Sequence, residues 1–407
     1  MEKKLHFKFS YIKYGLVFLL INIVSFTLVF SSMKNIKFAA PVDEGYYLKY
    51  ATHIAENGVS GFPDLFKDYI QNNQNWLFPN PLRIGFITLS SIWLKLFGCS
   101  FLNLAYLSLF SFLIFLTISF YFVKKYFGRK IGFLFLTLSA FSPLNMAMAR
   151  RALMDSTANL FMACAIWLFL ESLREKKAYK TTLFVIIFAI TILIKESSVL
   201  LCPFFILFLL VRRWFFKKPI RIIDFLSITL LPFIPVGAIY FLAAGGTSSI
   251  IATFKIIMNS PHFNEYAILY GSGPWFRYLI DFILLSPWTC ILAIGFILYY
   301  VTVSKWQEEV LYLILLFISL VLLFVFLTKN VRYLIILDMP IRLFSVLMLN
   351  ELTQRLFKDK AYLIIIVIVI IISIFDYSNF NYLFVRQGIY DPSSTLLLQT
   401  RHIIPWR

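Results

Sequence analysis

Charged residues are scarce in this chain of 407 residues. Asp, Glu, Lys and Arg make up 14% of it, against about 25% in an ordinary soluble domain, whereas apolar residues reach 60%. So little charge cannot cover the surface of a large water-soluble domain. Helices satisfy their own backbone hydrogen bonds in lipid, so the sequence predicts an all-α, polytopic transmembrane helical bundle.

Cysteine and histidine are also rare, with four of each. The cysteines are scattered, and three of them lie in apolar stretches: Cys99, Cys164, Cys202 and Cys290. Such spacing fits neither a disulfide framework nor a cysteine-based metal site. We predict no metal ligands and no certain cofactor, and the sequence leaves open whether a divalent cation takes part.

Eleven stretches have a length suited to crossing a bilayer. They are 14–32, 101–123, 131–149, 156–173, 181–195, 197–211, 221–243, 276–300, 310–328, 333–349 and 361–376. The first is too long for the apolar part of a cleaved signal peptide, so we expect a retained helix. Leu82–Gly98 is amphipathic and interrupted by Arg83 and Lys95, so we place it in the membrane interface.

Positive charge predicts how these helices are oriented. The net charge of +18 would suggest a nucleic-acid partner in a soluble protein, but 21 of the 38 Lys and Arg residues fall in alternate short connections. Under the positive-inside rule this places the N-terminus in the cytoplasm of a multi-pass cell-membrane protein, with no nucleic-acid partner. The opposite face then carries a long first loop (33–100) with interfacial helices, a second loop (244–275), and three short turns. We divide the chain into a transmembrane unit (1–376) and a short outer tail (377–407).

The first outer loop opens with two adjacent carboxylates, Asp43 and Glu44, at the start of a probable helix. The simplest interpretation is helix capping, because helix N-termini favour negative charge. The alternative is a general base, with the neighbouring carboxylate orienting the acceptor or a metal ion. The aromatic residues Tyr46 and Tyr47 follow and could stack on a sugar.

Outer turns hold further ionisable side chains. Arg150 and Arg151 lie on the outer side against the positive-inside tendency, which suits a bound phosphate. An Arg151–Asp155 helical pair is the plain alternative and would contribute little. Lys195 and Glu196 divide two apolar stretches and could be no more than a polar turn.

The last outer turn carries Arg332 and Tyr333, and Asp338 and Arg342 follow four residues apart on one helix face, which predicts a structural pair. His262 lies in the second outer loop, where a surface role competes with substrate binding. All these connections fall on one side of the membrane, which structural accidents would not arrange.

In these positions the chain resembles the GT-C membrane glycosyltransferases, particularly the branch of protein O-mannosyltransferases and lipid A aminoarabinose transferases. The resemblance runs from Asp43 to about Asp338. It is carried by Asp43-Glu44 with Tyr47 and Ala51, Asn80-Pro81-Leu82 up to Phe97-Gly98, Ser142-Pro143 with Arg150 and Asp155, Lys195-Glu196, and Arg332-Tyr333 with Pro340. Relatives often have a double proline where this chain has Asn80-Pro81, and little chain follows Tyr382 to form an acceptor-binding domain.

The resemblance implies an enzyme that moves a sugar from a polyprenyl-phosphate donor to a hydroxyl of a lipid, glycan or protein acceptor, on the extracytoplasmic face and with inversion. Candidate catalytic residues are Asp43 as general base, Glu44 and Asp155. Candidate ligands of the donor phosphate are Arg150, Arg151, Lys195 and Arg332, and candidate substrate-binding residues are Tyr46, Tyr47, Glu196, His262 and Tyr333. A transporter or flippase of lipid-linked sugars is the main alternative, although transporters tend to bind near the bilayer midplane. A membrane acyltransferase is a weaker one, because no intramembrane histidine is available as a base.

Overall fold

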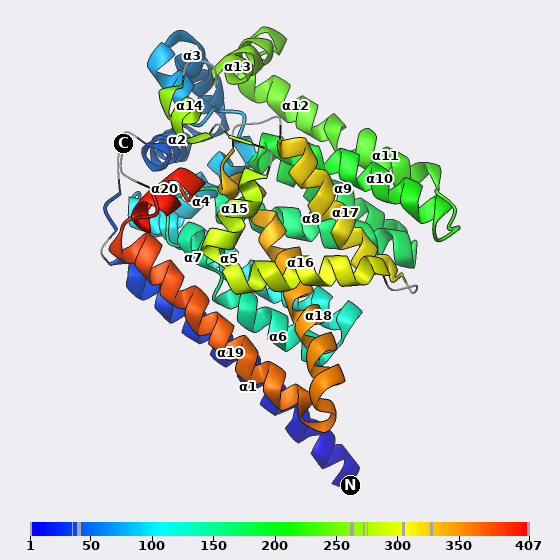
Figure 1. Cartoon of the computed structure of the whole chain (residues 1–407). Helices are drawn as coiled ribbons and strands as arrows, with labels where there is room; N and C mark the ends of the chain where they lie inside the picture. The colour runs from blue at the N-terminus through cyan, green and yellow to red at the C-terminus, as the bar shows by residue number, and fades with distance from the viewer. Residues whose placement is uncertain are drawn as a thin grey trace.

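The computed structural model describes residues 2–34, 36–38, 42–260, 264–271, 273–274, 276–302, 306–325 and 329–404 (Figure 1). Within these residues the regular elements are all helical, which confirms the all-α prediction. The first half contains α1 (Glu2–Met33), α2 (Asp43–Asn57), α3 (Phe62–Gln71), α4 (Ile84–Phe97), α5 (Phe101–Phe127), α6 (Arg129–Ala140), α7 (Pro143–Ala149), α8 (Asp155–Glu175), α9 (Ala178–Ile194) and α10 (Leu201–Trp214). The second half contains α11 (Ile222–Thr229), α12 (Phe233–Ala244), α13 (Thr247–Asn259), α14 (Glu265–Gly271), α15 (Arg277–Leu285), α16 (Pro287–Thr302), α17 (Glu308–Phe324), α18 (Asp338–Phe357), α19 (Ala361–Phe380) and α20 (Ser394–Thr400).

Six helical stretches of the described chain are long and apolar enough to cross a membrane, or seven if a bent pair counts as one span. They are Tyr14–Met33, Phe101–Phe127, Asp155–Glu175, Glu196–Trp214, Ile222–Ala244 and Val331–Arg386, with Arg129–Ala140 and Pro143–Ala149 as the bent pair. The stretch Val331–Arg386 contains both α18 and α19. Its 56 residues far exceed the roughly 20 that one span needs, so it is more than a single span. The polytopic bundle is confirmed, and the number of eleven spans stays a prediction.

Two local features shape the end of the bundle that matters below. The predicted span 131–149 is broken between α6 and α7 by a bend of 59°, where Pro143 opens α7 and the Ser142 hydroxyl caps it. Helix α4 has only 14 residues, about 21 Å at 1.5 Å per residue, and is too short to cross a bilayer. This length agrees with the interfacial position that its charges predicted.

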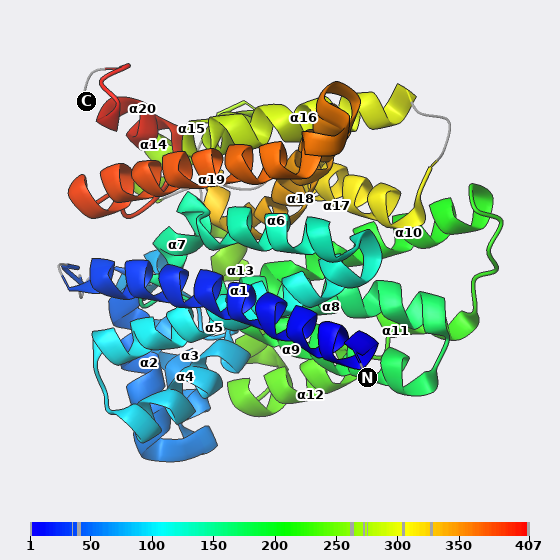
Figure 2. The ribbon, with the colours of Figure 1, turned by 90° about the horizontal axis from the view of Figure 1, so that it is seen from below.

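Helices α2, α3 and α13 gather at one end of the molecule, which we call the α2 end (Figure 1). The C-terminus lies near that end, whereas the N-terminus lies at the opposite end. Seen from below, α6 and α7 lie between α1 and α19 (Figure 2). The chain therefore returns to the α2 end after its last long helix.

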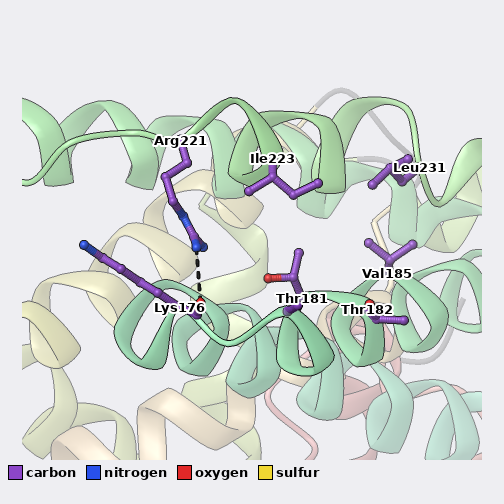
Figure 3. A pocket seen from close by; sticks show the side chains of 8 residues that line it. Lys176, Thr181, Thr182, Val185, Arg221, Ile223 and Leu231 are labelled. Atoms are coloured by element: carbon purple, nitrogen blue, oxygen red, sulfur yellow. Dashed lines mark hydrogen bonds between the residues drawn. The ribbon is translucent and has the colours of Figure 1, made fainter.

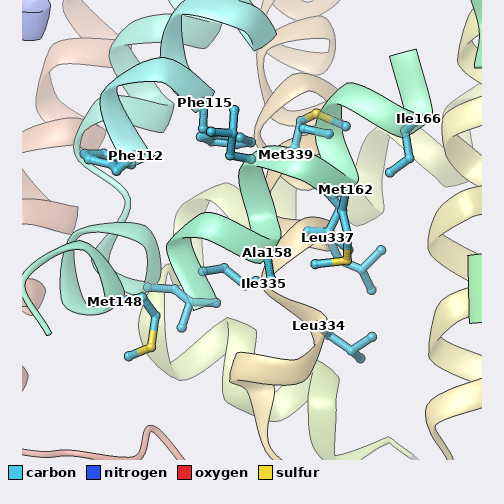
Figure 4. Close-up of a cluster of buried hydrophobic side chains, with 14 of the residues drawn as sticks. Phe112, Phe115, Met148, Ala158, Met162, Ile166, Leu334, Ile335, Leu337 and Met339 are labelled. Atoms are coloured by element: carbon cyan, nitrogen blue, oxygen red, sulfur yellow. The ribbon is translucent and has the colours of Figure 1, made fainter. Parts of the chain in front are cut away.

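Figure 4 shows part of the core of buried apolar side chains. Its labelled members come from α5, α7, α8, the 3₁₀ segment η5 (Val331–Leu337) and α18: Phe112, Phe115, Met148, Ala158, Met162, Ile166, Leu334, Ile335, Leu337 and Met339. Close packing fixes the relative positions of these elements. It thereby sets the first residue of α8, Asp155, beside Arg332 of η5.

Candidate active site

Nine charged side chains meet at the α2 end, and we call them the charged cluster. They are Asp43, Glu44, Arg83, Arg151, Asp155, Lys195, Glu196, Arg332 and Asp391. Seven of them were candidate site residues from the sequence. They come from separate connections, as the sequence predicted, and each is joined to another member by an ion pair.

Asp43 is the first residue of α2, and its side chain is 30% exposed. The helix begins after Val42 and has no side-chain cap, so Asp43 is not its N-cap, although it lies in the first turn, where negative charge is favourable. Burial raises the pKa of Asp43 above its ordinary value. The carboxylates of Asp391 and Asp155 act in the same direction, whereas Arg332 and Arg83 act against it.

Glu44 is fully buried and is held by Arg151. The Arg151 guanidinium donates through Nε and Nη2 to the two carboxylate oxygens, at 2.8 and 2.6 Å, and the Ala152 N–H donates to one of them at 3.1 Å. This two-pronged contact ties the start of α2 to the turn before α8. The helical Arg151–Asp155 pair is not the contact that Arg151 makes.

Asp155 lies between two cations. The Lys195 ammonium is 3.3 Å from Asp155 Oδ1, and Arg332 Nη1 is 3.8 Å from Asp155 Oδ2. Arg332 also reaches Asp43 Oδ2 through Nη2 at 3.4 Å. The Lys195 ammonium lies over the ring of Tyr333, 5.3 Å from its centre. Arg332 therefore adjoins both predicted catalytic aspartates, and Lys195 adjoins Asp155.

Arg83 is a member of the cluster that the sequence did not single out. Its guanidinium contacts Glu196, with Nε 3.3 Å from Oε2, and donates to the buried Tyr47 hydroxyl. Asn80 donates to Glu196 Oε1 at 2.9 Å. Helix α4 approaches α9 closely at Gly85, where an added Cβ would lie 3.0 Å from the backbone of Ile194. The sequence offered two signals for Arg83: its place next to Asn80-Pro81-Leu82, and its charge at the start of the apolar stretch Leu82–Gly98.

Asp391 and Tyr390 were also missed, because they lie in the tail beyond the last predicted span. Asp391 Oδ1 is 2.7 Å from Arg332 Nε and 3.0 Å from Asn330 Nδ2. The Tyr390 ring lies against two guanidinium groups, 4.6 Å from that of Arg151 and 5.4 Å from that of Arg332. The tail thus forms one wall of the charged cluster.

Two predicted residues lie elsewhere, and one cannot be placed. The guanidinium of Arg150 donates to the backbone carbonyls of Ser32 and Phe384 at 2.8 and 2.6 Å, and burial lowers its pKa to about 10. The Tyr46 ring stacks on the Phe78 ring, with 4.2 Å between the ring centres. His262 lies outside the described residues. The intramembrane pair Asp338–Arg342 forms as predicted, at 2.8 Å.

Pairing within the cluster leaves one carboxylate over. Each cation has a carboxylate within 3.3 Å: Arg83 with Glu196, Arg151 with Glu44, Lys195 with Asp155, and Arg332 with Asp391. The remaining carboxylate is Asp43, which is 30% exposed, whereas the side chains of the other four are between 0% and 19% exposed. Asp43 is therefore the acid of this cluster that is most accessible to a substrate.

The described residues offer no metal site, and a cavity between α9 and α11 lies apart from this cluster. The described part of the chain contains no group of three or more His, Cys, Asp or Glu side chains that could hold a metal ion. A cavity of about 410 Å³ lies between α9 and α11 and is lined by Lys176, Thr181, Val185 and Arg221 among others (Figure 3). Its lining on α9 ends at Val185, ten residues before Lys195, which is about 15 Å along the helix at 1.5 Å per residue.

Comparison with known proteins supports this picture. Residues 84–239 match the family model described as dolichyl-phosphate-mannose-protein mannosyltransferase. No curated protein sequence matches the chain. The fold is similar to that of ArnT from Cupriavidus metallidurans bound to undecaprenyl phosphate, with a TM-score of 0.55 and 14% identity over 97% of this chain and 75% of that one. It is also similar to the oligosaccharyltransferase of Archaeoglobus fulgidus in its apo form, with a TM-score of 0.61 and 11% identity over 93% of this chain and 56% of that one.

The match and the fold agree with the resemblance to the GT-C membrane glycosyltransferases. The match covers residues 84–239, and the similar structures share the fold of the chain at 11–14% identity. The long apolar helices make the chain a multi-pass membrane protein. It spans about half the length of the archaeal oligosaccharyltransferase, so that enzyme's further parts have no counterpart in the aligned region.

Proposed function

We propose that the protein transfers a sugar from a polyprenyl-phosphate donor to an acceptor hydroxyl, with Asp43 as the general base. The observation that carries this proposal is the pairing of the charged cluster. Four carboxylates are committed to cations, and Asp43 alone remains both accessible and loosely paired. The donor class is supported by the fold shared with ArnT, a protein whose structure was determined with undecaprenyl phosphate bound.

In the proposed reaction, Asp43 accepts the proton of the acceptor hydroxyl as its oxygen attacks the anomeric carbon. The bond from that carbon to the phosphate oxygen breaks, and its electron pair leaves with the polyprenyl phosphate. Attack opposite the leaving group inverts the configuration. The raised pKa of Asp43 suits this task, because a stronger base accepts the proton more readily.

Lys195 and Arg332 are the proposed ligands of the donor phosphate. Both lie next to Asp155, and their contacts with it, at 3.3 and 3.8 Å, are long enough for a phosphate oxygen to share. Preorganised cations stabilise the charge that gathers on the leaving phosphate. Arg151 and Arg150 are already bound to a carboxylate and to backbone carbonyls, so we assign them to holding the site together.

A flippase of lipid-linked sugars would need a polar path deeper in the helices. The intramembrane group around Arg342 does not offer one, because Arg342 is fully buried and bonded to Asp338, Asp376 and Ser286. We therefore assign that group to helix packing and keep transfer, on the extracytoplasmic face, as the proposed activity.

The test compares cells that lack the gene with cells that carry it in wild-type or Asp43→Asn form. Mass spectrometry of glycolipids and surface glycans should reveal a sugar that only the wild-type gene restores. The same sugar in cells with the Asn variant at normal expression would refute Asp43 as the base. Identical glycans in all three strains would refute the transfer itself.

A further inference from the structure

The C-terminal tail brings an acid to the charged cluster that the proposed reaction does not use. After α19 the chain passes through a π-helical segment (Asn381–Arg386) and reverses at Gly388, whose φ of +66° favours glycine. Asp391 then comes to lie within 2.7 Å of Arg332, although 59 residues separate them in sequence. The side chains of both residues are only 7% exposed.

The contact fixes one particular edge of the Arg332 guanidinium. The Asp391 carboxylate forms an ion pair on the Nε side at 2.7 Å, while Nη2 is directed to Asp43 at 3.4 Å and Nη1 lies 3.8 Å from Asp155. The Asn330 side chain supports this arrangement. Its Nδ2 donates to Asp391 Oδ1 at 3.0 Å, and its Oδ1 accepts from the backbone N–H of Arg332 at 3.0 Å. The Tyr390 ring covers the guanidinium.

One guanidinium therefore faces three carboxylates, and the distances rank them. Attraction between opposite charges grows as they approach, so the contact with Asp391 at 2.7 Å dominates those at 3.4 and 3.8 Å. Without the Asp391 charge, the same guanidinium would be free to close on Asp43. A tightly paired carboxylate is a poorer proton acceptor, because the cation favours its ionised form.

We propose that Asp391 is a positioning residue for the general base: it holds Arg332 by the Nε edge and so keeps the guanidinium from closing on Asp43. The inference rests on the proposed role of Asp43. It makes the tail part of the active site, in addition to the connections that carry the candidate residues.

The electrostatic surroundings of Asp43 point the same way. The charged groups that act on it are Arg332, Asp391, Arg83 and Asp155, and the tyrosines Tyr47, Tyr333 and Tyr390 also lie close enough to interact. Among the neighbouring groups, Asp391 is the largest of those that raise the pKa of Asp43, after burial itself. Neutralising Asp391 therefore removes one group that raises the pKa of Asp43. It also strengthens the attraction between Arg332 and Asp43, which lowers that pKa.

The test is an infrared titration of Asp43 in the full-length protein in lipid nanodiscs, which needs no knowledge of the sugar. The carboxyl band of Asp43 is identified by its loss in Asp43→Asn. In Asp391→Asn we expect its titration midpoint to fall by about one pH unit, because opposite charges within a few ångströms shift carboxyl pKa values by about one to three units. Asp391→Glu should restore the wild-type midpoint.

Asp224→Asn is the matched control, because Asp224 is also a buried aspartate paired with an arginine, Arg221, but belongs to α11. In Asp224→Asn the titration midpoint of Asp43 should equal that of the wild type. An unchanged midpoint in Asp391→Asn overturns the inference, and so does an equal fall in Asp224→Asn. The activity of Asp43→Asn in cells is read separately: if it is normal, the proposed base is wrong, whatever the titration shows.

Discussion

Asp43→Asn should separate catalysis from stability. The substitution preserves the size of the side chain but removes its ability to accept a proton, and general-base catalysis contributes about 10²–10⁴-fold to rates. Transfer should therefore fall by about that factor. Because the side chain caps no helix and is 30% exposed, nothing in its contacts predicts unfolding.

The sign of the stability effect follows from the pKa. Burial raises the pKa of Asp43, so the fold disfavours the ionised form that prevails at neutral pH. The neutral Asn removes this penalty, and the melting temperature should stay equal or rise. The stability difference should shrink as the pH is lowered and vanish below the ordinary pKa of an aspartate, where the carboxyl is protonated in both the folded and the unfolded protein. Wild-type activity should already fall as the pH is lowered through the raised pKa.

Glu44→Gln is the contrasting variant, because Glu44 is fully buried and accepts two bonds from Arg151 and one from Ala152. Losing its charge leaves Arg151 without its partner, which costs up to about 3–5 kcal/mol for a buried pair. Thermal unfolding of both purified variants, together with product formation in cells, measures the contrast. Near-normal activity of Asp43→Asn, or a loss of stability equal to that of Glu44→Gln, would refute the assignment.

Three further results are expected. Replacing Lys195 or Arg332 with Ala should raise the KM for the donor or lower turnover by roughly 10- to 100-fold, the worth of a charge-assisted hydrogen bond; unchanged kinetics in both would exclude a phosphate site there. Arg150→Ala should instead lower the melting temperature with little effect on the donor KM, because Arg150 holds two backbone carbonyls; a selective KM effect would contradict this. A cysteine introduced at Phe127 should resist labelling from outside intact cells, and its labelling would reverse the predicted topology.

The sequence predicted the helical fold well because lipid imposes a simple local rule. A stretch of about 20 apolar residues reports a span without knowledge of its neighbours, and α5 and α8 extend the predicted spans 101–123 and 156–173 by only a few residues. The bend between α6 and α7 was missed, because an apolar composition continues through Ser142-Pro143. The positive charge of the connections also predicted which turns lie on the same side of the membrane.

Pair identities in the charged cluster could not be predicted in this way. Local spacing suggested that Arg151 would pair with Asp155 four residues later, yet Arg151 binds Glu44, 107 residues away. Asp391 has no periodic or spacing signal at all, and only the reversal at Gly388 brings it to Arg332. Such contacts depend on tertiary packing, which residue spacing along one chain does not encode.

The balance of charge in the cluster also constrains how a donor can enter. Four cations already satisfied by four carboxylates cannot act as an open positive surface, so an incoming phosphate must share partners with an acid that is present. Long contacts are the cheapest to share, and Asp155 is the carboxylate whose contacts with two cations, Lys195 and Arg332, are both 3.3 Å or longer. A phosphate bound between those two cations lies beside Arg332 and therefore near Asp43, the acid that takes up a proton in the proposed reaction. The bound phosphate gains one negative charge when its bond to the sugar breaks, and Asp43 loses one when it is protonated, so the net charge of the buried site stays the same during transfer.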